Sequence, residues 1–213
     1  MAKTTVDISM SVDGFIAGPN QTVEEPLGRG GEQLHQWLFA AAGWRERHGQ
    51  AGGEENADST LVRESLDATG AVVMGRRMFS GGHGPWESDP VAGGWWGDEP
   101  PFGVPVFVLS HHAREPLVLG GETAFTFVTE GVEAALEQAR AAAGDRNVAV
   151  AGGADVVRQF LAAGHLDEIQ IHLAPVLLGD GVRLFDGDLQ PGLELMRVVD
   201  SPTVTHLTYR VTH

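Results

Sequence analysis

NVAVAGGADVVRQFL, residues 147–161, is the stretch that decides the fold of this chain. Its apolar run at 148–150 is typical of a short strand buried on both faces of a sheet. Gly152 and Gly153 end the run, and apolar residues then recur at helical spacing until Gly164. A strand, a glycine pair and a helix present bare backbone amides at the positive end of a helix dipole, an arrangement that binds phosphate. A tight turn against the sheet explains the two glycines equally well.

The composition indicates the class of protein and excludes several kinds of partner. The chain has 213 residues, of which 42% are apolar and 20% charged, so it can bury the core of one globular domain. Its net charge of −15 argues against nucleic acid or an anionic membrane, because the phosphates of either would be repelled. It has no cysteine, which excludes disulfides and thiolate ligands. No signal peptide or membrane-length apolar run is recognised, so we expect a cytoplasmic protein.

Strands and helices alternate through most of the chain, and strands pair at its end. Strands are expected at 4–11, 71–74, 105–109, 125–128, 148–150, 166–173, 193–199 and 204–211. Helices are expected around 34–41, from Asp58 or Ser59 to Gly70, over VEAALEQARAAA before Gly144, and after Gly153. This order predicts an α/β domain with a mostly parallel sheet and an antiparallel edge. The segment 80–105 holds three tryptophans, so we expect an ordered loop or lid rather than a linker.

Small, basic or hydroxyl-bearing residues follow four of the expected strands. They are Ala17-Gly18, Gly75-Arg76-Arg77, Ser110-His111 and Gly152-Gly153. In open α/β sheets the ligand lies across the carboxyl ends of the parallel strands, so we expect these residues to surround it. A guanidinium is a planar fork that suits phosphate, and Arg76 and Arg77 stand out in a chain of this negative charge. The alternative is that an arginine forms a structural salt bridge, which explains either residue alone better than it explains both.

Five motifs carry a resemblance to a known family. They are SVDGFIAG (11–18), VVMGRRMF (72–79), VFVLSHH (106–112), VAGGADVVRQFL (150–161) and LDEIQIHLAPVLLGDGVRLF (166–185). In this order they resemble the dihydrofolate-reductase-like family, and within it the branch related to the reductase (C-terminal) domain of the bifunctional riboflavin-biosynthesis deaminase–reductase. The resemblance implies one domain over residues 1–213, with a central, mostly parallel mixed sheet, antiparallel C-terminal edge strands and flanking helices.

The resemblance also implies that the chain binds NADPH. In the family, the turn that matches Ile16 and Ala17 lies along the nicotinamide ring, and the glycine-arginine pair after the second strand approaches the phosphates. The serine after the third strand, assisted by the next histidine, holds the 2′-phosphate, and the double glycine meets the pyrophosphate. The cofactor residues implied here are Ile16, Ala17, Gly75, Arg76, Arg77, Ser110, His111, Gly152, Gly153, Ala154, Asp155 and Val156.

The family pattern is incomplete on the substrate side. Folate reductases place a carboxylate on the helix that matches residues 34–39, where no acid falls securely, and clamp folate with an arginine that is missing between Arg77 and Ser110. We therefore expect an NADPH-dependent reductase of a small heterocyclic substrate, pterin-like or ribitylamino-pyrimidine-like. The alternatives are a flavin-using or flavin-reducing protein on the same fold, and a non-catalytic nucleotide-binding or sensor protein.

Hydride transfer needs a nearby proton source. Asp13, beside the expected nicotinamide turn, is the best-placed acid, although an Asp-Gly turn explains it better. Asp155 is expected to cap its helix. Trp37 and Trp86 are candidates to wall a pocket for a flat heterocycle. The adjacent histidines at 111–112 would point in opposite directions from a strand end, so we expect no metal site there.

The expected partners are a small-molecule substrate and a second copy of the chain. The resemblance implies a homodimer that pairs through the C-terminal half. The apolar run LAPVLLG, residues 173–179, is the expected contact surface.

Overall fold

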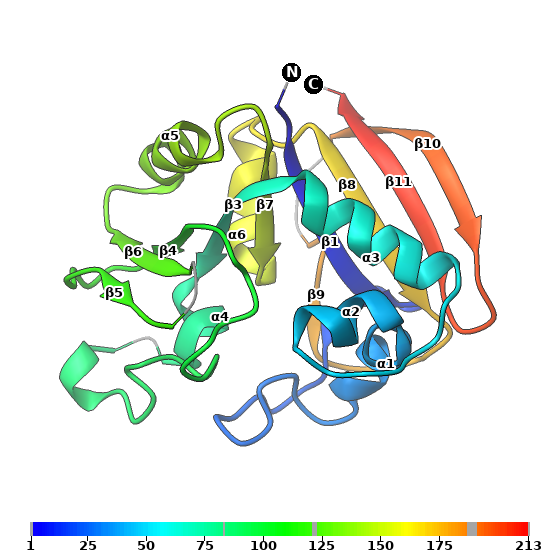
Figure 1. Ribbon diagram of the computed structural model, residues 1–213, viewed down its shortest axis with the longest axis horizontal. Coiled ribbons are helices and arrows are strands. Elements are labelled where there is room, and N and C mark those ends of the chain that lie inside the picture. Colours follow the sequence, from blue (N-terminus) through cyan, green and yellow to red (C-terminus); the bar gives the residue numbers. More distant parts are fainter. Residues whose placement is uncertain (1, 83, 121–122, 187–190, 213) are drawn as a thin grey trace. The chain divides into compact units, whose positions relative to one another are not determined.

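The computed structural model describes residues 2–82, 84–120, 123–186 and 191–212 (Figure 1). By its internal contacts the chain divides into two compact units. Unit 1 comprises Met1–Val6 and Thr69–His165, and unit 2 comprises Asp7–Ala68 and Leu166–His213. Strand β1 (Thr4–Ser11) contributes its first residues to unit 1 and the rest to unit 2. Within the described residues, no helix is both long enough and apolar enough to cross a membrane.

Unit 1 is built on a sheet whose strands lie in the order β1, β7, β3, β4, β6, β5. All neighbours are parallel except β5 and β6 at the edge. The strands after β1 are β3 (Thr69–Gly75), β4 (Val106–Leu109), β5 (Leu117–Val118), β6 (Ala124–Val128) and β7 (Asn147–Gly152). The helices are α4 (Arg76–Ser80), η2 (Trp86–Ser88), α5 (Val132–Ala143) and α6 (Ala154–Ala162). Strand β3 is buried on both faces, which is why its sequence reads as a continuous apolar run.

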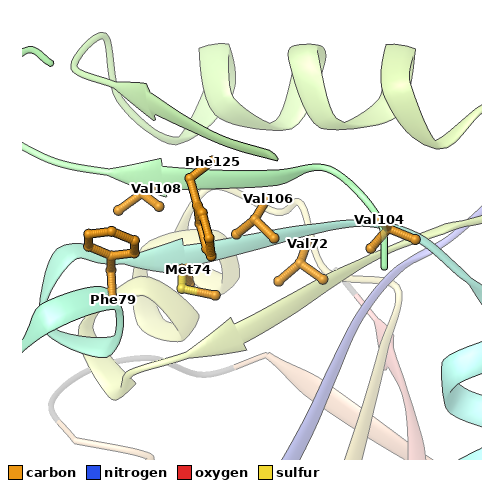
Figure 2. Packing of buried hydrophobic residues seen from close by; sticks show 7 residues of the cluster. All are labelled: Val72, Met74, Phe79, Val104, Val106, Val108 and Phe125. Atoms are coloured by element: carbon orange, nitrogen blue, oxygen red, sulfur yellow. The ribbon is translucent and has the colours of Figure 1, made fainter. Parts of the chain in front are cut away.

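The core of unit 1 is a cluster of apolar side chains from β3, β4, β6 and α4 and from Val104, two residues before β4 (Figure 2). Its buried members are Val72, Met74, Phe79, Val104, Val106, Val108 and Phe125. Phe79 from α4 meets Phe125 from β6 edge to face, with ring centroids 5.0 Å apart. Trp86, Trp96 and Phe102 of the 80–105 segment pack against the same cluster, so these described parts of the segment are ordered, as its tryptophans predicted.

Unit 2 contains strands in the order β10, β11, β8, β1, in which β11 is antiparallel to both of its neighbours. These strands are β8 (Glu168–Ala174), β10 (Gly192–Asp200) and β11 (Thr205–Thr212). A second, two-stranded sheet pairs β2 (Phe15–Ala17) with β9 (Val182–Arg183). The helices are η1 (Gly31–His35), α1 (Gln36–Ala40), α2 (Ala42–Arg47) and α3 (Ala57–Ala68). Leu207 of β11 lies opposite Ile171 of β8 and Val198 of β10, which fixes the register.

The fold class predicted from the sequence is confirmed. The parallel strands of unit 1 alternate with helices, and the chain closes on an antiparallel pair at the predicted place. Helix α5 occupies the predicted VEAALEQARAAA segment.

Two local predictions differ from the structure. The helix expected around 34–41 is divided into η1 and α1, and it ends where Ala41 becomes extended. Helix α3 is capped by Asn56, whose Oδ1 accepts a hydrogen bond from the Ser59 amide at 3.1 Å. Asp58 and Ser59, the predicted caps, are buried inside α3 because their side chains make tertiary hydrogen bonds.

Candidate active site

The glycine pair lies where β7 ends and α6 begins. Gly152 has a φ of 119°, which side chains rarely adopt, and its peptide bond to Gly153 is cis. Gly153 has a φ of −73°, and a Cβ built on it meets no atom within 4 Å. Val156 and Val157 donate their amides to the Gly153 carbonyl at 3.1 and 3.2 Å, which closes the first turn of α6. The backbone therefore requires Gly152, whereas Gly153 leaves open space at a helix N-terminus, the kind of position that suits phosphate.

Three strand ends lie side by side in unit 1. The sheet register pairs Met74 with Gly152 and Gly75 with Leu109, so the ends of β3, β7 and β4 are adjacent. A Cβ on Gly75 would lie 2.9 Å from Cγ2 of Val156, so this glycine lets α6 approach β3 closely. The structure thus brings together three of the four strand ends that the sequence predicted to surround a ligand.

Arg76 is buried and holds the loop that follows α4. Only 7% of it is exposed, its Nη2 lies 2.5 Å from Oδ2 of Asp89, and its Nε donates to Ser80 Oγ at 3.1 Å. The guanidinium carbon lies 3.1 Å from the centroid of the Trp86 ring, and Nη1 is buried without a partner among the described residues. Burial opposes the ionisation of Asp89, yet hydrogen bonds from Ser80 and Arg76 hold the pKa of that carboxyl below its usual value. Arg76 therefore makes the structural salt bridge that the sequence left open, and its contact with a phosphate stays a prediction.

Arg77 differs from its neighbour because it points to solvent. Its side chain is 70% exposed, and its Nη1 lies 3.9 Å from Oδ2 of Asp155, which is itself 67% exposed. Asp155 does not cap α6; it lies in the first turn and pairs with Arg158 Nη2 at 2.5 Å. Its charge there suits the positive end of the helix dipole. Arg77 is thus the arginine after β3 that an anionic ligand can reach.

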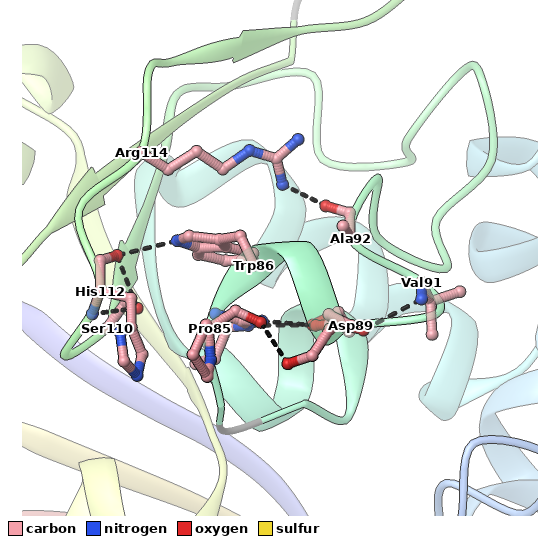
Figure 3. A network of polar contacts seen from close by, with 11 residues as sticks. Pro85, Trp86, Asp89, Val91, Ala92, Ser110, His112 and Arg114 are labelled. Atoms are coloured by element: carbon pink, nitrogen blue, oxygen red, sulfur yellow. Dashed lines mark hydrogen bonds and ion pairs between the residues drawn. The ribbon is translucent and has the colours of Figure 1, made fainter.

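Ser110 closes the turn after β4 (Figure 3). Its Oγ donates to the His112 carbonyl at 3.0 Å and accepts from the His112 amide at 3.1 Å. The same carbonyl accepts a hydrogen bond from Trp86 Nε1 at 2.9 Å. A second guanidinium carbon, that of Arg114, lies 4.8 Å from the Trp86 centroid, so this ring is fixed between two arginines and has a packing role. His111 is exposed.

In unit 2, the turn after β1 is fixed by Asp13. Its carboxylate accepts hydrogen bonds from the amides of Leu178 and Gly179 at 3.1 and 2.7 Å. A hydrogen bond with Ser11, followed by those backbone amides, lowers the pKa of Asp13 to about 2. An acid of this strength is ionised at neutral pH, so the structure favours the turn-forming role over that of a proton donor. Ile16 and Ala17 lie in β2 and are buried; their place beside the nicotinamide ring stays a prediction.

A chain of four polar side chains in unit 2 was missed by the sequence reasoning. His172 Nε2 contacts Asp7 Oδ1, and the Nδ1 atoms of His172 and His206 are 2.6 Å apart. At the other end, His206 Nε2 lies 2.9 Å from Asp58 Oδ1. The Trp37 ring packs against both imidazoles, with centroids 4.4 Å from His172 and 5.0 Å from His206. Trp37, predicted as a pocket wall, therefore covers this network.

The network joins residues that are far apart in the sequence. They come from β1, α3, β8 and β11, and Trp37 comes from α1. Trp37 also donates from Nε1 to Ser9 Oγ at 3.1 Å, which explains why a serine is buried in β1. The available signal was an aspartate or a histidine in the interior of each of three predicted strands, because such groups are buried only with partners.

Three solved structures have folds similar to that of this chain. A proposed riboflavin biosynthesis protein from Shewanella sp. PV-4 has 21% identity over 99% of both chains, with a TM-score of 0.65. A riboflavin biosynthesis reductase of Saccharomyces cerevisiae has 13% identity over 100% of this chain and 89% of that chain, with a TM-score of 0.53. The chain also spans 56% of a diaminohydroxyphosphoribosylaminopyrimidine deaminase/5-amino-6-(5-phosphoribosylamino)uracil reductase of Thermotoga maritima, with 99% of this chain covered, 14% identity and a TM-score of 0.55.

Sequence comparisons give one short match and one long one. The uncharacterised protein YwjB of Bacillus subtilis strain 168 is 38% identical over 60 residues, which are 28% of this chain and 34% of that protein. The chain thus matches about a third of this relative's length. Residues 2–207 match a family described as the RibD C-terminal domain. Because this match extends over nearly the whole sequence, the chain belongs to the RibD C-terminal domain family.

Proposed function

We propose that the chain is an NADPH-dependent reductase that transfers hydride to a small heterocyclic substrate, pterin-like or ribitylamino-pyrimidine-like. Its family membership supports an oxidoreductase related to the riboflavin pathway. The observation that carries the proposal is the group of adjacent strand ends in unit 1, where glycine turns and the N-terminus of α6 suit phosphate. We propose one reductase domain over residues 1–213, acting in the cytoplasm.

The side chains at these strand ends fit the phosphates of a dinucleotide. Gly153 leaves a space that a Cβ would fill, and the first turn of α6, residues 154–156, opens beside it. Arg77 offers an exposed planar fork, and we assign it the 2′-phosphate in place of Arg76, with Ser110 and the exposed His111 as further donors. When bound, NADPH supplies the hydride. The part of this chain is to hold the phosphates, orient the ring and keep water away.

Titration with both reduced cofactors tests the proposal. The protein is titrated with NADPH and with NADH, and loss of reduced-nicotinamide absorbance is then followed with 5-amino-6-(5-phosphoribosylamino)uracil, a dihydropterin and a flavin. We expect tighter binding of NADPH than of NADH, and oxidation with one of the first two substrates. Oxidation with the flavin alone would indicate a flavin reductase instead. Binding without oxidation would indicate a nucleotide sensor, and equal curves for the two cofactors would contradict the 2′-phosphate assignment.

We also propose that the chain forms a homodimer, and that β10 provides the contact. Within the LAPVLLG run, the large apolar residue that is exposed is Leu177, with 75% of its surface accessible. The edge strand β10 exposes a larger set of apolar side chains, each with 41–54% of its surface exposed: Leu193, Leu195, Met196 and Val198. An open edge strand with exposed apolar side chains is a surface that proteins normally cover. A second copy of the chain presents the same edge and covers both by two-fold pairing.

A further inference from the structure

Strand β10 contains one extra residue relative to the strand beside it. Its register with β11 pairs Leu195 with Tyr209 and then Arg197 with Thr208, which leaves Met196 without a partner in β11. Such a β-bulge places two residues where the neighbouring strand has one, so the alternation of side chains shifts by one residue. The bulge therefore decides which side chains of β10 share a face.

One face of β10 is apolar. Leu193, Leu195 and Val198 lie opposite alternate residues of β11, so they point to the same side of the sheet. Those residues of β11 are Val211, Tyr209 and Leu207. All three side chains of β10 are exposed. Without the bulge, Val198 would point to the other side, and the apolar face would be divided.

The other face of β10 carries two charges of opposite sign. Glu194 and Arg197 lie opposite alternate residues of β11, so both point to this side. Arg197 Nη1 lies 2.8 Å from Oε2 of Glu64 in α3. Arg210 Nη1 in β11 lies 2.8 Å from Oε2 of Glu194. All four side chains remain 50–55% exposed, so each ion pair can take a further partner.

Counted by rungs, with the bulge as one rung, the strand reads the same in both directions. An apolar rung and a charged rung precede the bulge, and a charged rung and an apolar rung follow it. In order, the five rungs are Leu193, Glu194, the pair Leu195-Met196, Arg197 and Val198. The two charged rungs lie next to the bulge on opposite sides. An antiparallel copy of the strand centred on the bulge therefore sets apolar rungs against apolar rungs and a negative charge against a positive one.

We propose that β10 pairs with β10 of a second copy in this one register, with the two-fold axis at the bulge. The proposal rests on the homodimer proposed above and assigns its contacts. Leu193 lies opposite Val198 of the second copy, and Glu194 lies opposite Arg197 of the second copy. The two-fold axis repeats both contacts. Each new ion pair joins the two ion pairs of the other face into a row of alternating charge, and the two edges close each other.

Other two-fold registers of the same edge fit less well. Centring the pair on Glu194 sets this carboxylate against its own copy, and centring it on Arg197 does the same for the guanidinium. Like charges directly opposite each other destabilise a strand pair. Centring on Leu193 uses only residues 192–194 of the strand. Centring on Val198 sets the acidic Asp200 against the apolar bulge.

The chain has no cysteine, so a disulfide can report the register directly. Leu193→Cys and Val198→Cys are made as separate proteins and then mixed under mild oxidation. Directly opposed residues have Cα atoms about 4.5–5.5 Å apart, which a disulfide can span. We expect covalent dimers from the mixture and not from either variant alone, because each position lies four rungs, about 13 Å, from its own copy. Each single variant is thus the matched control for the mixture.

Charge reversal tests the ion pairs across the axis. Glu194→Arg sets positive against positive, and Arg197→Glu sets negative against negative. Sedimentation should show that each variant dimerises about 10-fold or more weakly than the parent, and that the mixed dimer forms about 10-fold or more tightly than either variant alone. In the mixed dimer every facing pair has opposite signs. The contacts with Glu64 and Arg210 inside each copy are the same alone and mixed, so they do not contribute to this difference.

The outcomes separate the register from the homodimer. A dimeric parent whose mixed cysteine variants do not cross-link, or in which Leu193→Cys cross-links equally well alone, overturns the register and leaves the homodimer standing. Charge variants that associate no better when mixed also overturn it. A monomeric parent overturns both proposals, and the bulge then keeps the edge unpaired. None of these measurements uses turnover, so the reductase function is judged separately.

Discussion

Arg76 and Arg77 are adjacent in the sequence, and the structure predicts opposite effects for their substitution. Arg76→Ala leaves Asp89, whose side chain is 2% exposed, without its cation. Removing one partner of a buried ion pair costs about 3–5 kcal/mol, which lowers the melting temperature of a chain of this size by roughly 6–20 °C. Arg77 is 70% exposed and has no close ion pair, so Arg77→Ala should change the melting temperature by no more than about 2 °C.

The effects on cofactor binding should run the other way. One lost charge-assisted contact with the 2′-phosphate is worth about 1.5–3 kcal/mol, so Arg77→Ala should weaken NADPH roughly 10- to 150-fold. NADH has no 2′-phosphate, and its affinity should not change. In the folded fraction of Arg76→Ala, the ratio of the two affinities should remain that of the parent.

The assay combines thermal unfolding without ligand and fluorescence titration with both cofactors, for the parent and both variants. Arg76→Ala with Asp89→Ala is the control, because removing both charges should recover part of the lost stability. The reasoning is refuted if Arg76→Ala melts like the parent and loses the preference for NADPH. An unchanged NADPH-to-NADH ratio in Arg77→Ala would refute the other half.

Three further predictions use single positions. Gly153→Ala should keep the melting temperature, because a Cβ there meets no protein atom, and should lose most NADPH affinity, because the Cβ fills the space proposed for phosphate. Gly152→Ala, at a φ of 119°, should instead destabilise the fold by roughly 1 kcal/mol or more. A loss of melting temperature in Gly153→Ala with unchanged NADPH affinity would make Gly153 a structural turn. Because its pKa is lowered to about 4, His35 stays neutral in the folded protein where the unfolded chain binds a proton. The free energy of unfolding should therefore fall by about 3 kcal/mol as the pH falls from 6.5 to about 4, and His35→Gln should remove this loss. Identical curves of unfolding free energy against pH for the parent and the variant would contradict this prediction. Sedimentation should show a dimer, and Leu195→Lys should give a 22.6 kDa monomer; a monomeric parent would end the dimer proposal.

The sequence predicted those parts of the fold that depend on neighbours along the chain. Helix α5 follows from the VEAALEQARAAA segment and the Gly144 that ends it. Strand β3 follows from a compact apolar run, and the pair β10 and β11 from alternation. The glycine pair could be placed at a strand end for the same reason. Each of these signals lies within a few residues of the feature that it predicts.

Properties that depend on distant partners could not be predicted in this way. Nothing local distinguishes Arg76 from Arg77; the burial of Arg76 depends on Asp89, 13 residues further on, and on Trp86. The contacts of His172 with Asp7 and of His206 with Asp58 span 165 and 148 residues. Periodicity indicates which face of a strand is buried, but not that polar groups buried there are paired with one another.

Asp7 and Asp13 show why a lowered pKa alone does not identify a proton donor. Both carboxylates belong to the first segment of unit 2, and the pKa of each lies below its usual value. Asp13 is held by the hydroxyl of Ser11 and by backbone amides, which are donors that do not give up their protons at neutral pH. Asp7 is held by the imidazole of His172 and by the hydroxyl of Ser65. The two lowered pKa values therefore have different causes, and neither one identifies the group that gives a proton to a substrate.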